Sequence, residues 1–507
     1  MLALDEYIEN TSLTRAFLVS IATFVPVAAI VVVQESIPLQ HLEEGWSANY
    51  GFWARFVVLA VSASYTTATH FGIMVEGANL SPRQFLLFSA HFAVVFTALV
   101  VVMASVWIFP IPFVAMSASL PAFVALVVSF RVAVGDRIFR EVAARRDQIL
   151  AYNKFGVVQW SMAMVYPIYQ VAFRASIDSK WELPVLMLLP VIKTFLKSIF
   201  VRTFTGKEDM GPEGVIFTID FFDALYLATC VQSVTSITSV VVLMTIDILQ
   251  TTVELYDLHD RMRHICGTDK SLLSEVIQSL NQDRSRKSIS SDISVYSCIA
   301  HRLSSKRRAF LETLDKYLVR RAVCKKVSER ATRTKRSIVV RSNVVIPNTA
   351  VIPSGGERTN SKASAKIPSA KLLDLDEALE VLFTAECLVL TEYLEAAIPI
   401  LYGSFLVMMV HFPSAQFHQE MEGVTRHNVI GMVQIMLTYA VLELVSLVVL
   451  AVIMQRTCGI RALHHLAFVL ETQAPLVQSK LIMWTVVTLS FRVAHFGTID
   501  GEESLWH

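Results

Sequence analysis

The chain has little of what soluble folds are built from. Only 17% of its 507 residues are charged, whereas a soluble domain carries about a quarter. Glycine and proline number only 18 and 16, which excludes collagen-like chains and chains that are disordered throughout. The six cysteines form no C-x-x-C pair, so neither a disulfide framework nor a zinc site is expected. The composition therefore excludes most soluble classes.

Common catalytic motifs are also missing. The chain contains no G-x-x-x-x-G-K-S/T phosphate loop and no G-x-G-x-x-G, H-E-x-x-H or G-x-S-x-G motif. We therefore predict that the protein is not an enzyme and has no cofactor, no metal and no nucleic-acid partner. His70 and His91 lie in apolar blocks. We interpret them as core histidines, because a haem relay across a membrane needs further pairs.

What the chain has is apolar residues in long blocks. They make up 54% of the sequence, and the mean hydropathy is +0.53. The blocks are about 20 residues long, which is the length of helix that crosses a bilayer core of about 30 Å. This pattern predicts an all-α, polytopic transmembrane helix bundle with about 9–10 membrane helices. The expected spans are 16–33, 56–75, 85–109, 113–134, 155–173, 215–249, 394–411, 429–454 and 477–496.

A tenth apolar stretch, 183–201, is weaker as a span. Its uncharged part runs only from Leu183 to Ile192, because Lys193 and Lys197 follow. Ten residues are too few to cross a bilayer. We expect the stretch to lie at the outer face or to dip into it. The alternative is a full span, because the two lysines of a tilted helix can extend their side chains to the membrane surface.

The distribution of Lys and Arg predicts the orientation. Basic residues crowd the segment 131–154 and the long segment 250–376, and both are expected in the cytoplasm. An even number of crossings must then separate them, which favours nine crossings in all. The N-terminus is expected inside and the C-terminus outside. Loops 34–55 and 412–428 are then expected to face outward.

Three regions are predicted from composition and charge: an N-terminal membrane bundle (1–249), a basic, partly disordered cytoplasmic loop (250–376) and C-terminal membrane helices (377–507). Between Arg261 and Lys371 there are 24 Lys and Arg against 8 Asp and Glu, although the whole chain carries only +1. Such an asymmetry is typical of an interaction surface. An amphipathic helix over 374–393 is expected to lead into the seventh span.

The basic loop is predicted to bind anionic lipids. Residues 306–330 form a helical pattern with an apolar side and a basic side, as in helices that lie on membranes. The expected lipid-binding residues are Lys306, Arg307, Arg308, Arg320, Arg321, Lys325 and Lys326. Three serines that neighbour basic residues, Ser285, Ser288 and Ser337, are candidate phosphorylation sites. Phosphorylation there would weaken the attraction to the membrane.

One further resemblance supports the membrane class. The segments Phe221–Tyr226, Asp247–Gln250 and Glu254–Asp257, with Glu392–Glu395, resemble large families of multi-pass membrane proteins of oomycetes. None of these motifs is tied to an activity, so the resemblance implies a fold and supplies no site residues.

Ionisable and polar residues inside spans are the remaining functional candidates, because burying them in hydrocarbon is costly. Glu443 lies midway along its span, while Asp220, Asp223 and Asp247 bracket the span 215–249 and are expected at its solvated ends. That span also carries a ladder of polar residues that includes Gln232. Such residues join helices or line a path for water. The predicted transport-path residues are Glu443, Asp220, Asp223, Asp247 and Gln232.

The sequence supports two functional hypotheses. The first is a transporter or channel in a membrane whose identity is open, with Glu443 and the polar side of 215–249 along the route. The second is a membrane signalling or scaffolding protein that acts through its basic cytoplasmic loop. The fold class alone does not choose between them.

Overall fold

A computed structural model describes residues 2–111, 114–177, 179–203, 214–233, parts of 241–260, and 369–493 with His495. Within these residues all regular structure is helical, apart from one isolated bridge between His418 and Val493. The predicted all-α fold is confirmed. The chain divides into two compact units, one of residues 1–6 and 258–384 and one of residues 7–257 and 385–507.

The smaller unit contributes the beginnings of two helices among its described residues. These helices are α1 (Leu2–Asn10) and α16 (Ser369–Met409), and both continue into the larger unit. The expected amphipathic helix over 374–393 and the expected span over 394–411 therefore belong to one continuous helix.

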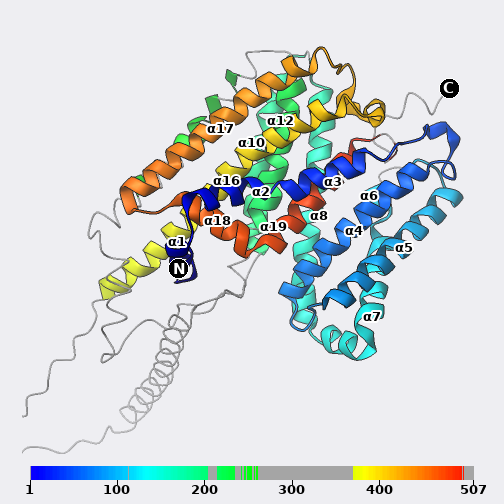
Figure 1. Ribbon diagram of the computed structural model, residues 1–507, viewed down its shortest axis with the longest axis horizontal. Coiled ribbons are helices and arrows are strands. Elements are labelled where there is room, and N and C mark those ends of the chain that lie inside the picture. Colours follow the sequence, from blue (N-terminus) through cyan, green and yellow to red (C-terminus); the bar gives the residue numbers. More distant parts are fainter. Residues whose placement is uncertain are drawn as a thin grey trace, which may run out of the picture. The chain divides into compact units, whose positions relative to one another are not determined.

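The larger unit is a bundle of helices (Figure 1). In chain order it contains α2 (Leu13–Ala22), α3 (Val25–Glu35), α4 (Tyr50–Met74), α5 (Pro82–Val106), α6 (Val114–Ser117), α7 (Ser119–Ala143), α8 (Arg146–Arg174), α9 (Glu182–Leu186) and α10 (Leu188–Thr203). A π-helical turn, η3 (Ile216–Asp220), leads into α12 (Phe221–Ser233). The remainder comprises α16, two 3-10 turns η4 (Pro413–Phe417) and η5 (Gln419–Met421), α17 (Val429–Cys458), α18 (Ala462–Thr472) and α19 (Ala474–Phe491).

Six helical segments are long and apolar enough to cross a membrane, as judged by length and composition. They are Leu13–Glu35, Tyr50–Met74, Pro82–Val106, Glu182–Phe200, Phe383–Met409 and Val429–Arg456. Many of their outward side chains are aliphatic: Leu86, Val94 and Val441 are 70%, 69% and 57% exposed. Side chains of this kind suit contact with lipid. The fold is that of a multi-pass membrane protein.

The stretch 183–201 differs from the expectation. It forms α9 and α10, and Glu182–Phe200 is one of the six segments that meet the length and composition of a span. Lys193 is buried against carboxylates of other helices. The positive charge of Lys193 is therefore paired inside the protein, so the side chain does not need to reach the membrane–water interface. By length and composition the stretch can therefore form the full span that was the alternative, and whether it crosses stays a prediction.

The central helix is α12. Every residue from Phe221 to Val231 is buried, and α8, α10 and α17 pack against it. Helix α19 packs against α3 and α4. A helix that is buried on all sides contacts only protein, so its polar side chains must find protein partners.

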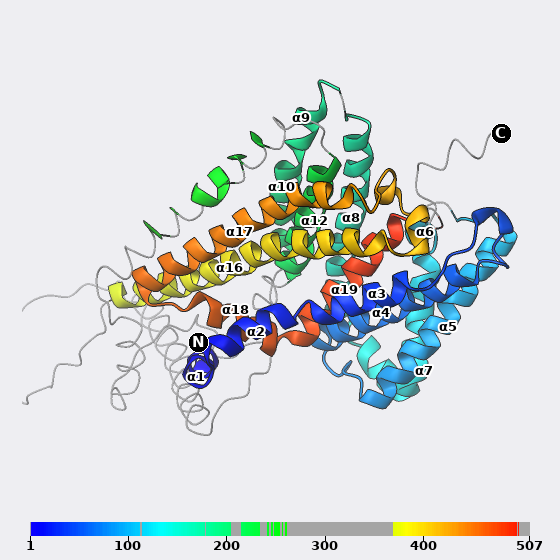
Figure 2. The ribbon, with the colours of Figure 1, turned by 45° about the horizontal axis from the view of Figure 1, so that its top comes forward.

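Helices α16 and α17 run side by side in both ribbon views (Figures 1 and 2). Gly403 of α16 lies where they meet, and a Cβ atom there would stand 2.8 Å from Met436 Cε and 3.1 Å from Val433 Cγ1 of α17. Small residues allow helices in membranes to approach closely. The close approach brings the buried side of α17 onto α16.

Candidate functional site

Lys193 is surrounded by three buried carboxylates. Its Nζ lies 2.5 Å from Glu395 Oε1, 3.2 Å from Asp223 Oδ2 and 3.7 Å from Asp220 Oδ1. The lysine comes from α10, the aspartates from η3 and α12, and the glutamate from α16. One ammonium group thereby joins three parts of the bundle.

Asp220 has two further partners. Lys197 Nζ, one turn beyond Lys193 on α10, lies 2.7 Å from Asp220 Oδ1. Thr391 of α16 donates a hydrogen bond of 2.9 Å to Asp220 Oδ2. Asp220 is the last residue of the π-helical turn, and such turns are frequent at functional sites. The turn thus brings the carboxylate into the interior between α10 and α16.

Glu443 enters the same site from α17. Carboxylate oxygens of Glu443, Glu392 and Glu395 all lie within 4.8 Å of one another. Glu443 is 4% exposed, whereas Leu442 and Leu444 on either side of it are 38% and 46% exposed. Helix α17 therefore presents aliphatic side chains outward and its glutamate inward.

We call these side chains the carboxylate–lysine centre, which consists of Lys193, Lys197, Asp220, Asp223, Glu392, Glu395 and Glu443. The centre contains five acidic and two basic side chains. Because like charges at such short distances disfavour full ionisation, the three glutamates favour a state in which at least one of them is protonated or paired with a cation.

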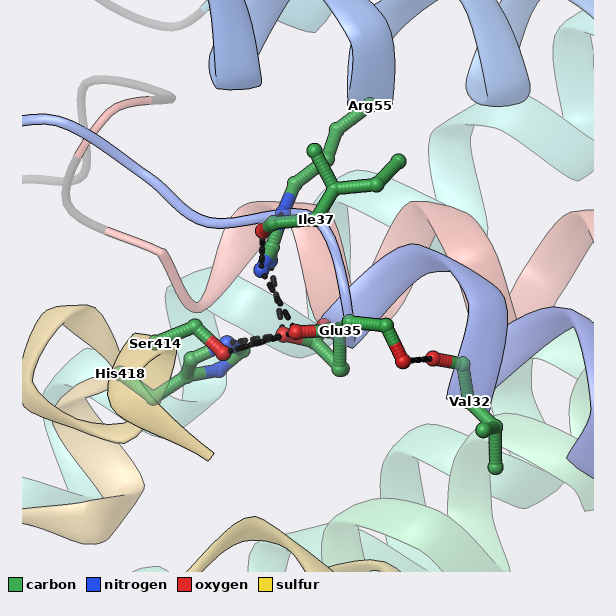
Figure 3. A network of polar contacts seen from close by, with 7 residues as sticks. Val32, Glu35, Ile37, Arg55, Ser414 and His418 are labelled. Carbon is green, nitrogen blue, oxygen red and sulfur yellow. Dashed lines mark hydrogen bonds and ion pairs between the residues drawn. The ribbon is translucent and has the colours of Figure 1, made fainter. Parts of the chain in front are cut away.

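A second buried cluster joins α3, α4 and η4 (Figure 3). Arg55 Nη1 lies 2.7 Å from Glu35 Oε2, and His418 Nε2 lies 3.0 Å from the same oxygen. Arg55 also donates to the Ile37 carbonyl at 2.7 Å, and Ser414 donates to the Glu35 carbonyl at 3.1 Å. We call these residues the Glu35 network. The positive charge of its one arginine balances the negative charge of its one carboxylate.

A third cluster, the Arg492 network, lies where α19 ends. Arg492 Nη1 pairs with Glu420 Oε1 at 2.5 Å, and its Nη2 donates to Thr229 Oγ1 of α12 at 2.9 Å. The guanidinium carbon also lies 5.2 Å and 5.3 Å from the ring centroids of Tyr226 and Tyr402. Stacking between two rings holds the arginine in place.

Three of the predicted transport-path residues meet in one site. Asp220, Asp223 and Glu443 all belong to the carboxylate–lysine centre. The expectation that the two aspartates lie at a solvated helix end was wrong: they are 0% and 6% exposed, because α10 and α16 cover them. Whether these residues carry anything stays a prediction.

Gln232 lies elsewhere, and it joins helices. It accepts a 2.7 Å hydrogen bond from Tyr402 of α16 and donates to the Glu420 carbonyl at 3.3 Å. Asp247 lies outside the described residues. So do the candidate lipid-binding residues of 306–330 and the candidate phosphorylation sites Ser285, Ser288 and Ser337.

Sequence reasoning missed the partners of these acids. Lys193 and Lys197 were treated as evidence against a span, although a lysine inside an apolar stretch is itself a sign of a buried partner. Glu392 and Glu395 are three residues apart in a helix, so they lie on one side of it. That spacing was the sequence feature that could have indicated a shared site for the two glutamates. Nothing in the sequence indicates that α10 faces α16.

The buried ion pairs among apolar helices define the class: a multi-pass α-helical membrane protein with charged groups in its interior. Comparison of the chain with protein-family models, curated proteins and solved structures finds no match. The resemblance to oomycete membrane protein families therefore stays a prediction.

Proposed function

We propose that the protein is a transporter in which the carboxylate–lysine centre binds and releases protons during transport. The observation that carries the proposal is the direct succession Glu443, Glu395, Lys193 and Asp223 across α17, α16, α10 and α12. An ionisable residue inside a membrane span suggests a functional site, and here several lie together.

The closeness of the carboxyl groups supports proton exchange at this centre. Glu392, Glu395 and Glu443 lie beside one another, and like charges at such distances disfavour the fully ionised state. A proton on one of these carboxyl groups relieves the repulsion. Because Glu392, Glu395 and Glu443 lie within 4.8 Å of one another, a proton shared among them moves over a short distance.

The geometry also links protonation to helix packing. Lys193 contacts both Glu395 and Asp223. When Glu395 gains a proton, the attraction of Lys193 to α16 weakens and its pairing with Asp223 and Asp220 dominates. Each protonation state therefore favours a different balance of contacts between α10, α12 and α16. A change of this kind is what alternating access requires.

Proton movement in reconstituted vesicles tests the proposal. Vesicles that contain the full chain are loaded with a pH-sensitive dye and given inward gradients of Na⁺, K⁺ or Ca²⁺. We expect cation-dependent proton movement with the wild type, and movement at the rate of protein-free vesicles with Glu443→Gln. The matched control is Glu141→Gln on the exposed surface of α7, which should behave as the wild type.

Infrared difference spectra of the same proteins provide an independent readout. Changing the pH should produce a buried carboxyl signal in the wild type, and Glu443→Gln should reduce it. If the wild type moves no protons under any gradient and shows no buried carboxyl signal, the transporter proposal is wrong. Signalling or scaffolding through the basic loop then becomes the leading hypothesis.

A further inference from the structure

A cavity lies between α3, α12, α16 and α19. It measures about 610 Å³ with its open mouth. Of the residues that line it, Val32 of α3 is 42% exposed and Ser404 of α16 is also exposed. These two helices belong to the candidate spans Leu13–Glu35 and Phe383–Met409. The cavity therefore opens between two helices that are long and apolar enough to cross a membrane. In a bilayer, an opening between two such helices faces the hydrocarbon.

The shape of the cavity is that of a slot. Its lining on α16 runs from Ile398 to Met408, a separation of ten residue steps or about 15 Å along a helix. Apolar side chains such as Val31, Leu225 and Phe405 make up most of its wall. Water finds few hydrogen-bond partners in such an apolar slot, whereas lipid chains lie at its mouth. An acyl chain therefore fits the slot better than water does.

The lining includes one charged side chain. Arg492 is only 3% exposed, and among the described residues its Nε–H has no hydrogen-bond acceptor. A buried donor without an acceptor costs about 1–3 kcal/mol. A ligand that brings an acceptor to this side chain would remove that cost.

The charges around Arg492 decide which acceptor fits. Its positive charge is already matched by Glu420 at 2.5 Å. A free carboxylate would bring a second negative charge beside Glu420, whereas an ester carbonyl is an acceptor without charge. We propose that the slot binds one ester-linked acyl chain of a bilayer phospholipid, with the ester carbonyl at Arg492 Nε.

The inner part of the slot reaches the neighbourhood of the carboxylate–lysine centre. Ile398 lies one turn after Glu395, and Phe221 directly follows Asp220. An acyl chain in the slot would therefore exclude water from this side of the centre. The lipid site itself does not depend on proton transport.

Photolabelling of the full chain tests the site. The probe is phosphatidylcholine with a diazirine in one acyl chain, added to the protein in vesicles and mapped by mass spectrometry of peptides. We expect adducts on α3, α16 and α19 within the slot. In Ala28→Phe the new ring fills the slot at α3. The loss of two or more buried methylenes should lower these adducts about tenfold.

Ala29→Phe is the matched control, since Ala29 is the next residue on α3 and is exposed. It should leave labelling in the slot unchanged. Arg492→Lys keeps a positive charge for Glu420 but removes the Nε–H, and it should weaken labelling while the protein stays folded. Circular dichroism and monodisperse elution show that each variant is folded.

Two results would overturn the proposal. Equal labelling of wild type and Ala28→Phe would mean that the probe reports only lipid surrounding the protein. Competition by oleic acid but not by unlabelled phosphatidylcholine would mean that the slot takes a free carboxylate and not an ester.

Discussion

The carboxylate–lysine centre and the Glu35 network are both buried polar clusters, but their charges are arranged differently. In the Glu35 network one arginine meets one carboxylate, and backbone carbonyls accept its remaining hydrogen bonds. In the centre Lys193 contacts three carboxylates, and three glutamates lie within 4.8 Å of one another. A single ion pair has one preferred arrangement, whereas several carboxyl groups around one lysine have several arrangements of protons and ion pairs.

The positions of the two clusters agree with this contrast. The Glu35 network ties the end of α3 to the loop 410–428, which fixes where a helix ends. Five of the seven side chains of the centre come from helical segments that are long and apolar enough to cross a membrane. We infer that the first cluster serves stability and the second serves exchange.

Arg55→Met should have the largest effect on stability. It leaves Glu35 buried without its arginine, and breaking such a pair costs about 3–5 kcal/mol. The free energy of unfolding in detergent measures the loss. The double variant Glu35→Gln with Arg55→Met removes both charges and should recover part of it. If the double variant is no more stable than the single one, charge balance is not what holds this network together.

A matched pair of variants in the centre should give a smaller and asymmetric effect. Lys193→Met removes the lysine that Asp220, Asp223 and Glu395 share, with a loss of about 2–3 kcal/mol. Asp223→Asn removes one of these three carboxylates and leaves Lys193 with the other two, so its cost should be below about 1 kcal/mol. Denaturant unfolding of both variants compares them. Equal losses would show that Lys193 depends on Asp223 as strongly as the three carboxylates depend on Lys193.

The exposed pair of Arg15 and Glu471 should have the smallest effect. Its side chains are 56% and 36% exposed, and such pairs contribute less than about 1 kcal/mol. Arg15→Gln should therefore shift the thermal unfolding midpoint only slightly, and added salt should reduce the shift further. A loss as large as that of Arg55→Met would mean that exposure does not separate the two kinds of pair.

Several features could be predicted from the sequence because they depend on short-range patterns. The apolar blocks predicted helices of membrane-crossing length, and Glu443 inside such a block predicted a buried carboxyl group. The stretch 183–201 was harder to judge by the same reasoning. Counting residues cannot show that Lys193 has Glu395, 202 residues away along the chain, as its partner.

The sequence by itself determined the class of this protein, since 54% apolar residues in long blocks leave few alternatives to membrane helices. It also determined which residues are costly to bury. Only the tertiary structure decided how those costs are met: Asp220 by Lys197 and Thr391, and Arg492 by Glu420. The physical reason is that charge compensation depends on distances between helices, which no local periodicity encodes.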